Sequence, residues 1–233
     1  MKIPGKSFFQ FAALGSLLLF FSVTAAFAGP TLICHQFDIG NAKSLPWISH
    51  DWNLTGGESY DTQHLATDTV AILDGDPTVL VHMETLRRAT LFARKDPQAA
   101  KELLTRLVAR ADSALKSKHA AALAQFDAGY LAETYKQWLG RDASDESNPA
   151  KGLNGYALVK KAIALRGGDS QMEFAAALIS LAGPAKEQME HAQKALAGAK
   201  SDPLLARNLA AHFMGPQTET LADLINRTKL AKE

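Results

Sequence analysis

Three Asp-Pro pairs divide the chain, and each has the pattern that begins an α-helix. An aspartate side chain can accept hydrogen bonds from the first free N–H groups of a helix. Proline suits the first helical position because its φ is already helical and no N–H is needed there. The pairs are Asp76-Pro77, Asp96-Pro97 and Asp202-Pro203, and Asp169 after Gly167-Gly168 is a fourth candidate cap. These signals predict a series of helices from about residue 59 onward.

Apolar residues between these caps recur every three to four positions, which is the spacing of one helix face. The spacing predicts a long helix over 119–138, a buried helix over 174–182 that is apolar on nearly every side, and a last helix from Leu221 to Thr228. No stretch alternates with the period of two that is typical of strands. We therefore expect an all-α fold of about nine helices, as a helical-hairpin array or an irregular bundle, with residues 59–233 as one domain.

Two units of similar build begin at Asp169 and Asp202, which lie 33 positions apart. Each runs from a cap through an apolar helix and a Gly-Pro pair into an amphipathic helix. Residues 169–233 therefore resemble the helical hairpins of the tetratricopeptide family, and the resemblance implies stacked hairpins with a continuous core. These units lack the Trp, Gly and Tyr signature of that family, and an irregular bundle explains the same pattern.

The first 28 residues have the pattern of a secretory signal peptide. Lys2 and Lys6 precede an apolar run over 8–23, and Ala26-Phe27-Ala28 places small residues where a signal peptidase reads them. The apolar run is shorter than the roughly 20 residues that a membrane-spanning helix needs. We therefore expect cleavage after Ala28, no membrane anchor thereafter, and a mature protein in a bacterial periplasm or outside the cell.

The chain is close to electrically neutral, with 25 Lys and Arg against 24 Asp and Glu. A chain without a basic stripe has no electrostatic reason to bind nucleic acid or anionic lipid. Its one cysteine cannot form an internal disulfide. A domain of about 200 residues buries enough surface to fold without one.

Residues 29–58 have no helical spacing, and glycines and prolines interrupt them, so we expect an irregular N-terminal arm. Within it, Cys34 and His35 are adjacent. A thiolate and an imidazole can bind zinc or copper, or the imidazole can activate the thiol. His50 and His64 are the candidates that would complete such a metal site.

A second interpretation of the arm needs no chemistry. Cys34 can be a small buried apolar residue beside its neighbours. Trp47 and Trp52 could line a ligand platform, but large apolar rings in such a segment more often pin it to a helical body. We expect the arm to lie ordered against the helices, anchored by both tryptophans.

The helical part shows no catalytic motif. His82 and Glu84 do not form the His-Glu-x-x-His pattern of zinc proteases. We expect His82 to be half-exposed and Glu84 to make ordinary helix ion pairs with Arg87 and Arg88. The chain has no nucleophile elbow, phosphate loop or dinucleotide fingerprint.

Together these patterns favour an exported, non-catalytic helical scaffold that binds another protein through its helical surface and needs no cofactor. The alternative is a metal-dependent or thiol-dependent site that the arm builds around Cys34, His35 and His50, with zinc or copper as the metal.

Overall fold

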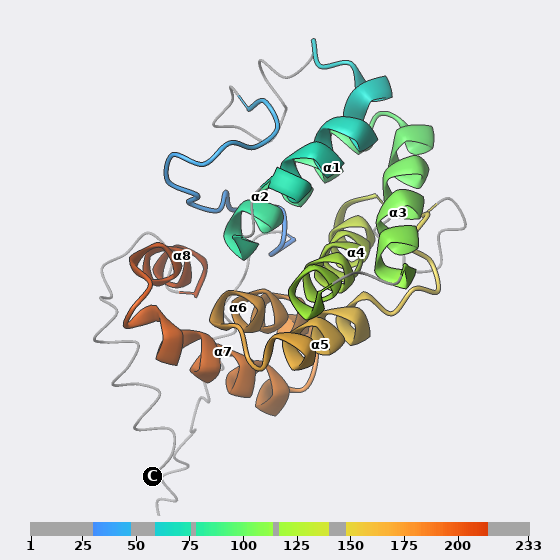
Figure 1. Ribbon diagram of the computed structural model, residues 1–233. Helices are drawn as coiled ribbons and strands as arrows, with labels where there is room; N and C mark the ends of the chain where they lie inside the picture. The colour runs from blue at the N-terminus through green and yellow to red at the C-terminus, as the bar shows by residue number, and fades with distance from the viewer. Residues whose placement is uncertain (1–29, 48–58, 76–77, 114–116, 140–147, 214–233) are drawn as a thin grey trace, which may run out of the picture.

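A computed structural model describes residues 30–47, 59–75, 78–113, 117–139 and 148–213 of the 233-residue chain. Its eight α-helices are α1 (Leu65–Gly75), α2 (Val79–Ala93), α3 (Pro97–Asp112), α4 (Lys118–Trp138), α5 (Gly155–Arg166), α6 (Ser170–Ile179), α7 (Ala185–Ala199) and α8 (Pro203–Phe213) (Figure 1). Two short 3-10 turns, η1 (Thr62–His64) and η2 (Ser180–Ala182), precede α1 and follow α6.

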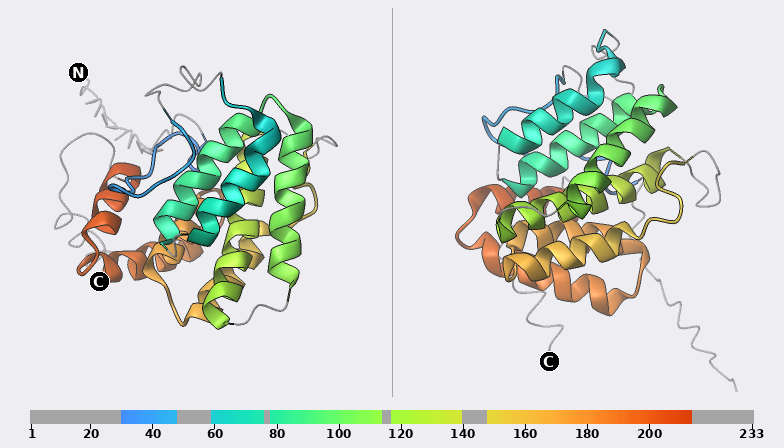
Figure 2. Two further views of the ribbon diagram at one scale, coloured as in Figure 1. Left: turned by 45° about the horizontal axis from the view of Figure 1, so that its top comes forward. Right: turned by 45° about the vertical axis from the view of Figure 1, so that its right-hand side comes forward.

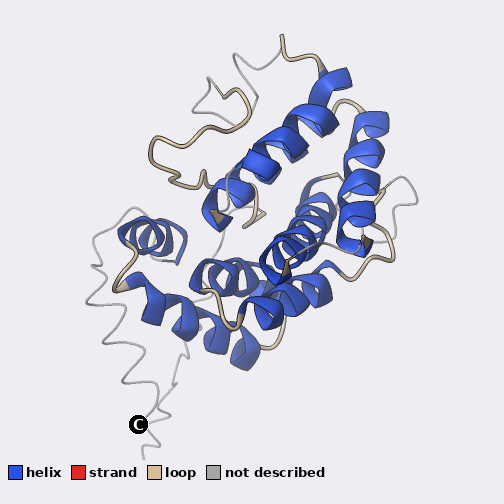
Figure 3. Cartoon of the chain, viewed as in Figure 1, coloured by secondary structure: helices blue, strands red, loops and turns tan. Residues whose placement is uncertain are grey.

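All regular secondary structure in the described ranges is helical, so the predicted all-α fold is confirmed (Figure 3). The count of eight is close to the expected nine. The segment of the expected last helix, from Leu221 to Thr228, lies outside the described residues. The resemblance to helical hairpin repeats therefore stays a prediction.

Aspartate caps begin three of the helices, as the sequence predicts. Asp96 accepts hydrogen bonds from the N–H groups of Gln98 and Ala99 at the start of α3, and Asp169 and Asp202 cap α6 and α8 in the same way. These side chains satisfy N–H groups that have no partner within the helix.

The predicted cap at Asp76-Pro77 lies outside the described residues. Helix α2 begins at Val79, after an extended Thr78 whose side chain makes no capping hydrogen bond. The N–H of Leu80 donates instead to the side-chain oxygen of Gln171, 3.1 Å away in α6. A contact with another helix thus satisfies an N–H group at the start of α2, which no local pattern could indicate.

Helix α4 lies at the centre of the molecule. It contacts α2, α3, α5 and α6, and most of its residues between Ala122 and Tyr135 are buried. Helices α1 to α3 lie on one side of it and α5 to α7 on the other (Figure 2). Helix α6 is buried from Met172 to Leu178, which confirms the buried helix expected in this region.

Helices α4 and α5 approach most closely at two glycines. A Cβ atom added to Gly129 would lie 2.5 Å from the carbonyl oxygen of Gly155, and one added to Gly155 would lie 2.3 Å from that of Gly129. Side chains cannot occupy that space, so the two glycines set the distance between the helices. This crossing fixes the position of Tyr156, the next residue of α5.

The described part of the N-terminal arm, residues 30–47, has no helix or strand, as expected, yet it belongs to the same core as the helices. The arm runs beside α2 and α8, as Figures 1 and 2 show. Four of its side chains are almost completely buried in the core: Leu32, Ile33, Phe37 and Leu45. Residues 30–47 therefore lie ordered against the helices, as the sequence analysis expects, and the rest of the predicted arm lies outside the described residues.

Candidate functional site

The residues proposed for a metal site do not form one among the described residues. No group of three or more His, Cys, Asp and Glu side chains in the described ranges could hold a metal ion. Cys34 is half-buried and His35 is exposed. His64 is exposed in η1, 3.7 Å from a carboxylate oxygen of Asp61. His50 and Trp52 lie outside the described residues.

The Cys34 thiol is in an environment that disfavours the thiolate. Burial raises its pKa to about 11, and the nearby Arg87 guanidinium lowers it by a smaller amount. The thiol is therefore protonated at neutral pH. Because the thiolate is both the nucleophile and the metal ligand, Cys34 in this environment is weakly reactive.

Trp47 packs against the hydrophobic core, and the guanidinium group of Arg87 lies 5.0 Å from the centre of its ring. One face of the ring is thus covered by a cation, which suits an anchoring residue. This is the arrangement expected of a tryptophan that pins the arm.

A buried ionic network joins the arm to α2. Glu84 is fully buried and accepts a hydrogen bond from the N–H of Phe37 at 3.0 Å, together with three from Arg87 and Arg88 at 2.7 to 2.9 Å. The two arginines also donate to carbonyl groups of the arm, Arg87 to Ile33 and Arg88 to Leu45. The predicted helix pairs of Glu84 with Arg87 and Arg88 are confirmed, but Glu84 is fully buried because the arm covers this face of α2.

A second set of hydrogen bonds joins the arm to α8. The side-chain amide of Asn208 accepts from the N–H of Asp38 and donates to its carbonyl oxygen, both at 2.8 Å. The guanidinium group of Arg207 donates to the carboxylate of Asp38 at 2.6 Å. This bond and one from the N–H of Gly40 lower the pKa of Asp38. Asp38 therefore keeps its charge in weak acid.

Three helices contribute to a chain of polar side chains that sequence reasoning missed. The hydroxyl of Tyr156 in α5 lies 2.7 Å from Nε2 of His191 in α7. Nδ1 of His191 is hydrogen-bonded to the buried carboxylate of Glu173 in α6, which Lys194 also approaches at 3.3 Å. Burial, and then a hydrogen bond with Glu187, raise the pKa of Tyr156. The phenol keeps its proton and acts as a hydrogen-bond donor.

Tyr156 and Glu187 lie in the wall of a cavity of about 580 Å³. Apolar side chains of Leu153, Ile179 and Pro184 also line it. Among the described residues, this cavity is large enough for a small molecule, and Tyr156 connects its wall to the buried His191 and Glu173. Binding pockets often combine apolar walls with a few such polar groups. The hydrogen-bonded side chains lie between positions 156 and 191 of the sequence, so no short sequence motif could indicate them.

His82 is another histidine whose environment differs from the expectation. It is fully buried, and its Nδ1 lies 2.5 Å from a carboxylate oxygen of Asp127 in α4. The expected half-exposed position is wrong because α2 is buried on nearly every side. The partner lies 45 positions away in the sequence.

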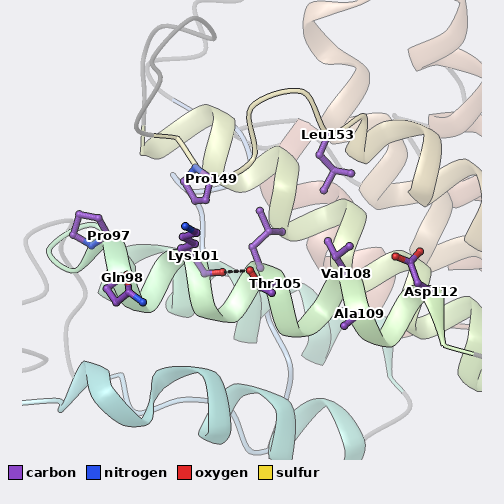
Figure 4. Close-up of a pocket in the computed structure, with 10 residues that line it drawn as sticks. Pro97, Gln98, Lys101, Thr105, Val108, Ala109, Asp112, Pro149 and Leu153 are labelled. Atoms are coloured by element: carbon purple, nitrogen blue, oxygen red, sulfur yellow. Dashed lines mark hydrogen bonds between the residues drawn. The ribbon is translucent and has the colours of Figure 1, made fainter.

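A groove of about 680 Å³ runs along α3 (Figure 4). Leu104 and Val108 of α3 face Pro149 and Leu153 from the segment that precedes α5. The polar residues that line it are Gln98, Lys101, Thr105 and Asp112. The groove therefore has an apolar floor and a polar rim.

No protein family matches this chain, and no curated protein or solved structure is significantly similar to it. Within the described residues, no helix combines the length and apolar character needed to cross a membrane.

Proposed function

We propose that this protein is an exported, non-catalytic helical scaffold, and that a segment of another protein binds in the groove along α3. The observation that carries the proposal is the shape of that groove. Its lining residues extend from Pro97 to Asp112, the full span of α3. At 1.5 Å per helical residue, this span is about 24 Å long. A long, open groove suits a polypeptide segment better than a compact metabolite.

The chemistry of the groove supports the same class of ligand. An apolar floor between polar edges accommodates an amphipathic helix or an extended peptide with alternating anchors. Lys101 and Asp112 near its two ends carry opposite charges, so they can orient a segment that has the complementary pair.

The rest of the described surface offers little apolar contact. Met189, with 42% of its surface accessible, is the only exposed large apolar side chain among the described residues. A broad hydrophobic interface would need more such residues. Apolar contacts to a partner would therefore come from the groove.

Site-specific photo-crosslinking in the source cells tests the proposal. A crosslinking amino acid replaces Thr105, which is exposed in the groove wall, and the control replaces Lys161, exposed on α5. We expect a discrete partner at position 105 and none at position 161. Ala109→Trp, which fills the groove, should abolish that product, whereas Ala164→Trp, at an exposed position of α5, should not. Equal products with both tryptophan variants would refute binding in the groove.

The alternative function is a metal-dependent or thiol-dependent site around Cys34, His35 and His50. Elemental analysis of the purified mature protein separates it from the scaffold. Stoichiometric zinc or copper that is lost in a Cys34→Ser, His35→Gln double variant would favour the alternative. The raised pKa of the Cys34 thiol supports the scaffold over a thiol-dependent site.

A further inference from the structure

His212 lies where the arm, α6 and α8 meet. Its ring is stacked on Phe37 of the arm, with the ring centres 4.5 Å apart and the planes 7° from parallel. The rings of His35 and Phe174 meet it edge-on at 5.5 Å. Only 3% of His212 is exposed. The imidazole thus completes an aromatic cluster that joins the arm, α6 and α8.

The hydrogen bonds of His212 suit a neutral ring. Nδ1 lies 2.9 Å from the carbonyl oxygen of Asn208 and donates to it. The main-chain carbonyl of His35 also lies near the ring, but the buried Nε2 makes no hydrogen bond of good geometry among the described residues. A neutral imidazole carries one N–H and one lone pair, so Nε2 holds the lone pair. Asn208 is also the residue whose side chain binds both main-chain groups of Asp38. One turn of α8 therefore holds residues 37 and 38 of the arm.

We propose that His212 is a pH-dependent latch for the N-terminal arm: the neutral imidazole holds residues 30–47 on α6 and α8, and its protonation loosens them.

The charged groups around the ring do not compensate an imidazolium. Glu84 of α2 is the acid that attracts it, but both its oxygens are bonded to Arg87 and Arg88. The carboxylate of Asp38 in the arm is paired with Arg207, and α6 presents the apolar ring of Phe174. The His35 ring, when charged, repels an imidazolium.

Burial lowers the pKa of His212 from 6.5 to about 4, against smaller upward contributions from the Asn208 and His35 carbonyl groups and from Glu84. The docked arm therefore binds this proton more weakly than a released arm, in which His212 is solvated. The contribution of the neutral ring to docking is complete above pH 6.5 and is lost as the pH falls toward 4. Between pH 7.5 and pH 5, the equilibrium should shift about 30-fold toward release.

Hydrogen–deuterium exchange of the mature protein at pH 7.5 and pH 5 tests the latch, after correction for intrinsic exchange rates. We expect the opening of peptides within residues 30–47 to increase about 30-fold at pH 5, with a much smaller change in α3. His212→Phe keeps an aromatic ring but cannot titrate, so its arm should not respond to acid. His64→Gln removes an exposed histidine and should respond as the wild type does.

An equal acid response of the arm in the wild type and in His212→Phe would overturn the latch. An equal response of α3 in the wild type would also overturn it, because acid would then be unfolding the whole molecule. If the phenylalanine variant has a loose arm at pH 7.5, an NMR titration of His212 in the wild type decides. A pKa well below 6.5 supports the latch, and a value of 6.5 or above overturns it.

Discussion

At the scale of single residues, Glu84 shows how burial changes the meaning of a sequence pattern. A glutamate three and four positions before two arginines is typical of exposed helix pairs, which contribute about 0.2–0.5 kcal/mol each. Here the carboxylate is fully buried, and its two arginines also bond to the arm. Glu84, Arg87 and Arg88 thus form the ionic centre of the contact between the arm and α2.

Replacing Glu84 by glutamine tests this difference. The substitution leaves the buried guanidinium of Arg87 without its charge partner, so we expect the free energy of unfolding to fall by about 3–5 kcal/mol. Urea unfolding followed by circular dichroism measures it. Glu102→Gln is the matched control, because Glu102 pairs with Arg106 at 42% and 47% side-chain exposure, and it should cost less than about 1 kcal/mol. Similar losses in the two variants would show that the Glu84 network contributes no more than a surface pair.

The polar contacts between helices mark the limit of sequence reasoning about the site. Cys34 and His35 attracted a metal hypothesis because they are adjacent in the sequence. Tyr156, His191 and Glu173 form a continuous hydrogen-bonded chain although each is on a different helix. Residue type and spacing reveal only partners on the same element, so the second group could not be predicted.

At the scale of helices, the cap residues in the sequence predicted the helix starts that depend on neighbouring residues alone. The caps at Asp96, Asp169 and Asp202 stand where the Asp-Pro and Gly-Gly patterns indicated. At the start of α2, Gln171 on another helix accepts a hydrogen bond from the N–H of Leu80, a contact that local patterns do not indicate. Helix existence and type therefore followed from the sequence, whereas one boundary depended on packing.

The α4–α5 crossing gives a test at this scale. Gly129→Ala gains about 1 kcal/mol of intrinsic helix preference, but its Cβ would lie 2.5 Å from a main-chain oxygen that cannot move alone. Overpacking costs about 1–3 kcal/mol and occasionally more, so after the gain of about 1 kcal/mol we expect net destabilisation of about 1–2 kcal/mol. Gly75→Ala, at the end of α1 with no atom within 4 Å of its added Cβ, should be neutral or slightly stabilising. Thermal unfolding of both variants measures the contrast, and an unchanged midpoint for Gly129→Ala would mean that the helices can separate freely.

At the scale of the whole molecule, the arm is part of the folded core. Each of its four buried side chains contributes about 1.5–3 kcal/mol on burial, or about 6–12 kcal/mol together. The stability of a typical domain is about 5–15 kcal/mol. The helical composition of this protein could be predicted from the sequence. The dependence of its stability on the irregular arm could not, because the hydrogen-bond partners of the arm lie on α2, α4 and α8.

Removing the arm tests its role. A chain that begins at residue 59 should keep helical circular dichroism but unfold at a much lower temperature than a chain that begins at residue 29. The reason is that burial of the four arm side chains is a large share of the stability of a typical domain. A truncated chain that unfolds cooperatively at the midpoint of the mature chain would show that the arm is dispensable.

The bond between Asp38 and Asn208 also sets an order of events during synthesis. The two residues are separated by 170 positions, and a ribosome adds about 5–20 residues per second. The arm therefore emerges roughly 10–30 s before its binding site on α8 exists. During that interval Leu32, Ile33 and Phe37 have no completed core to enter. Contacts between residues this distant in the chain form slowly, so these apolar side chains of the arm stay exposed until α8 has been made.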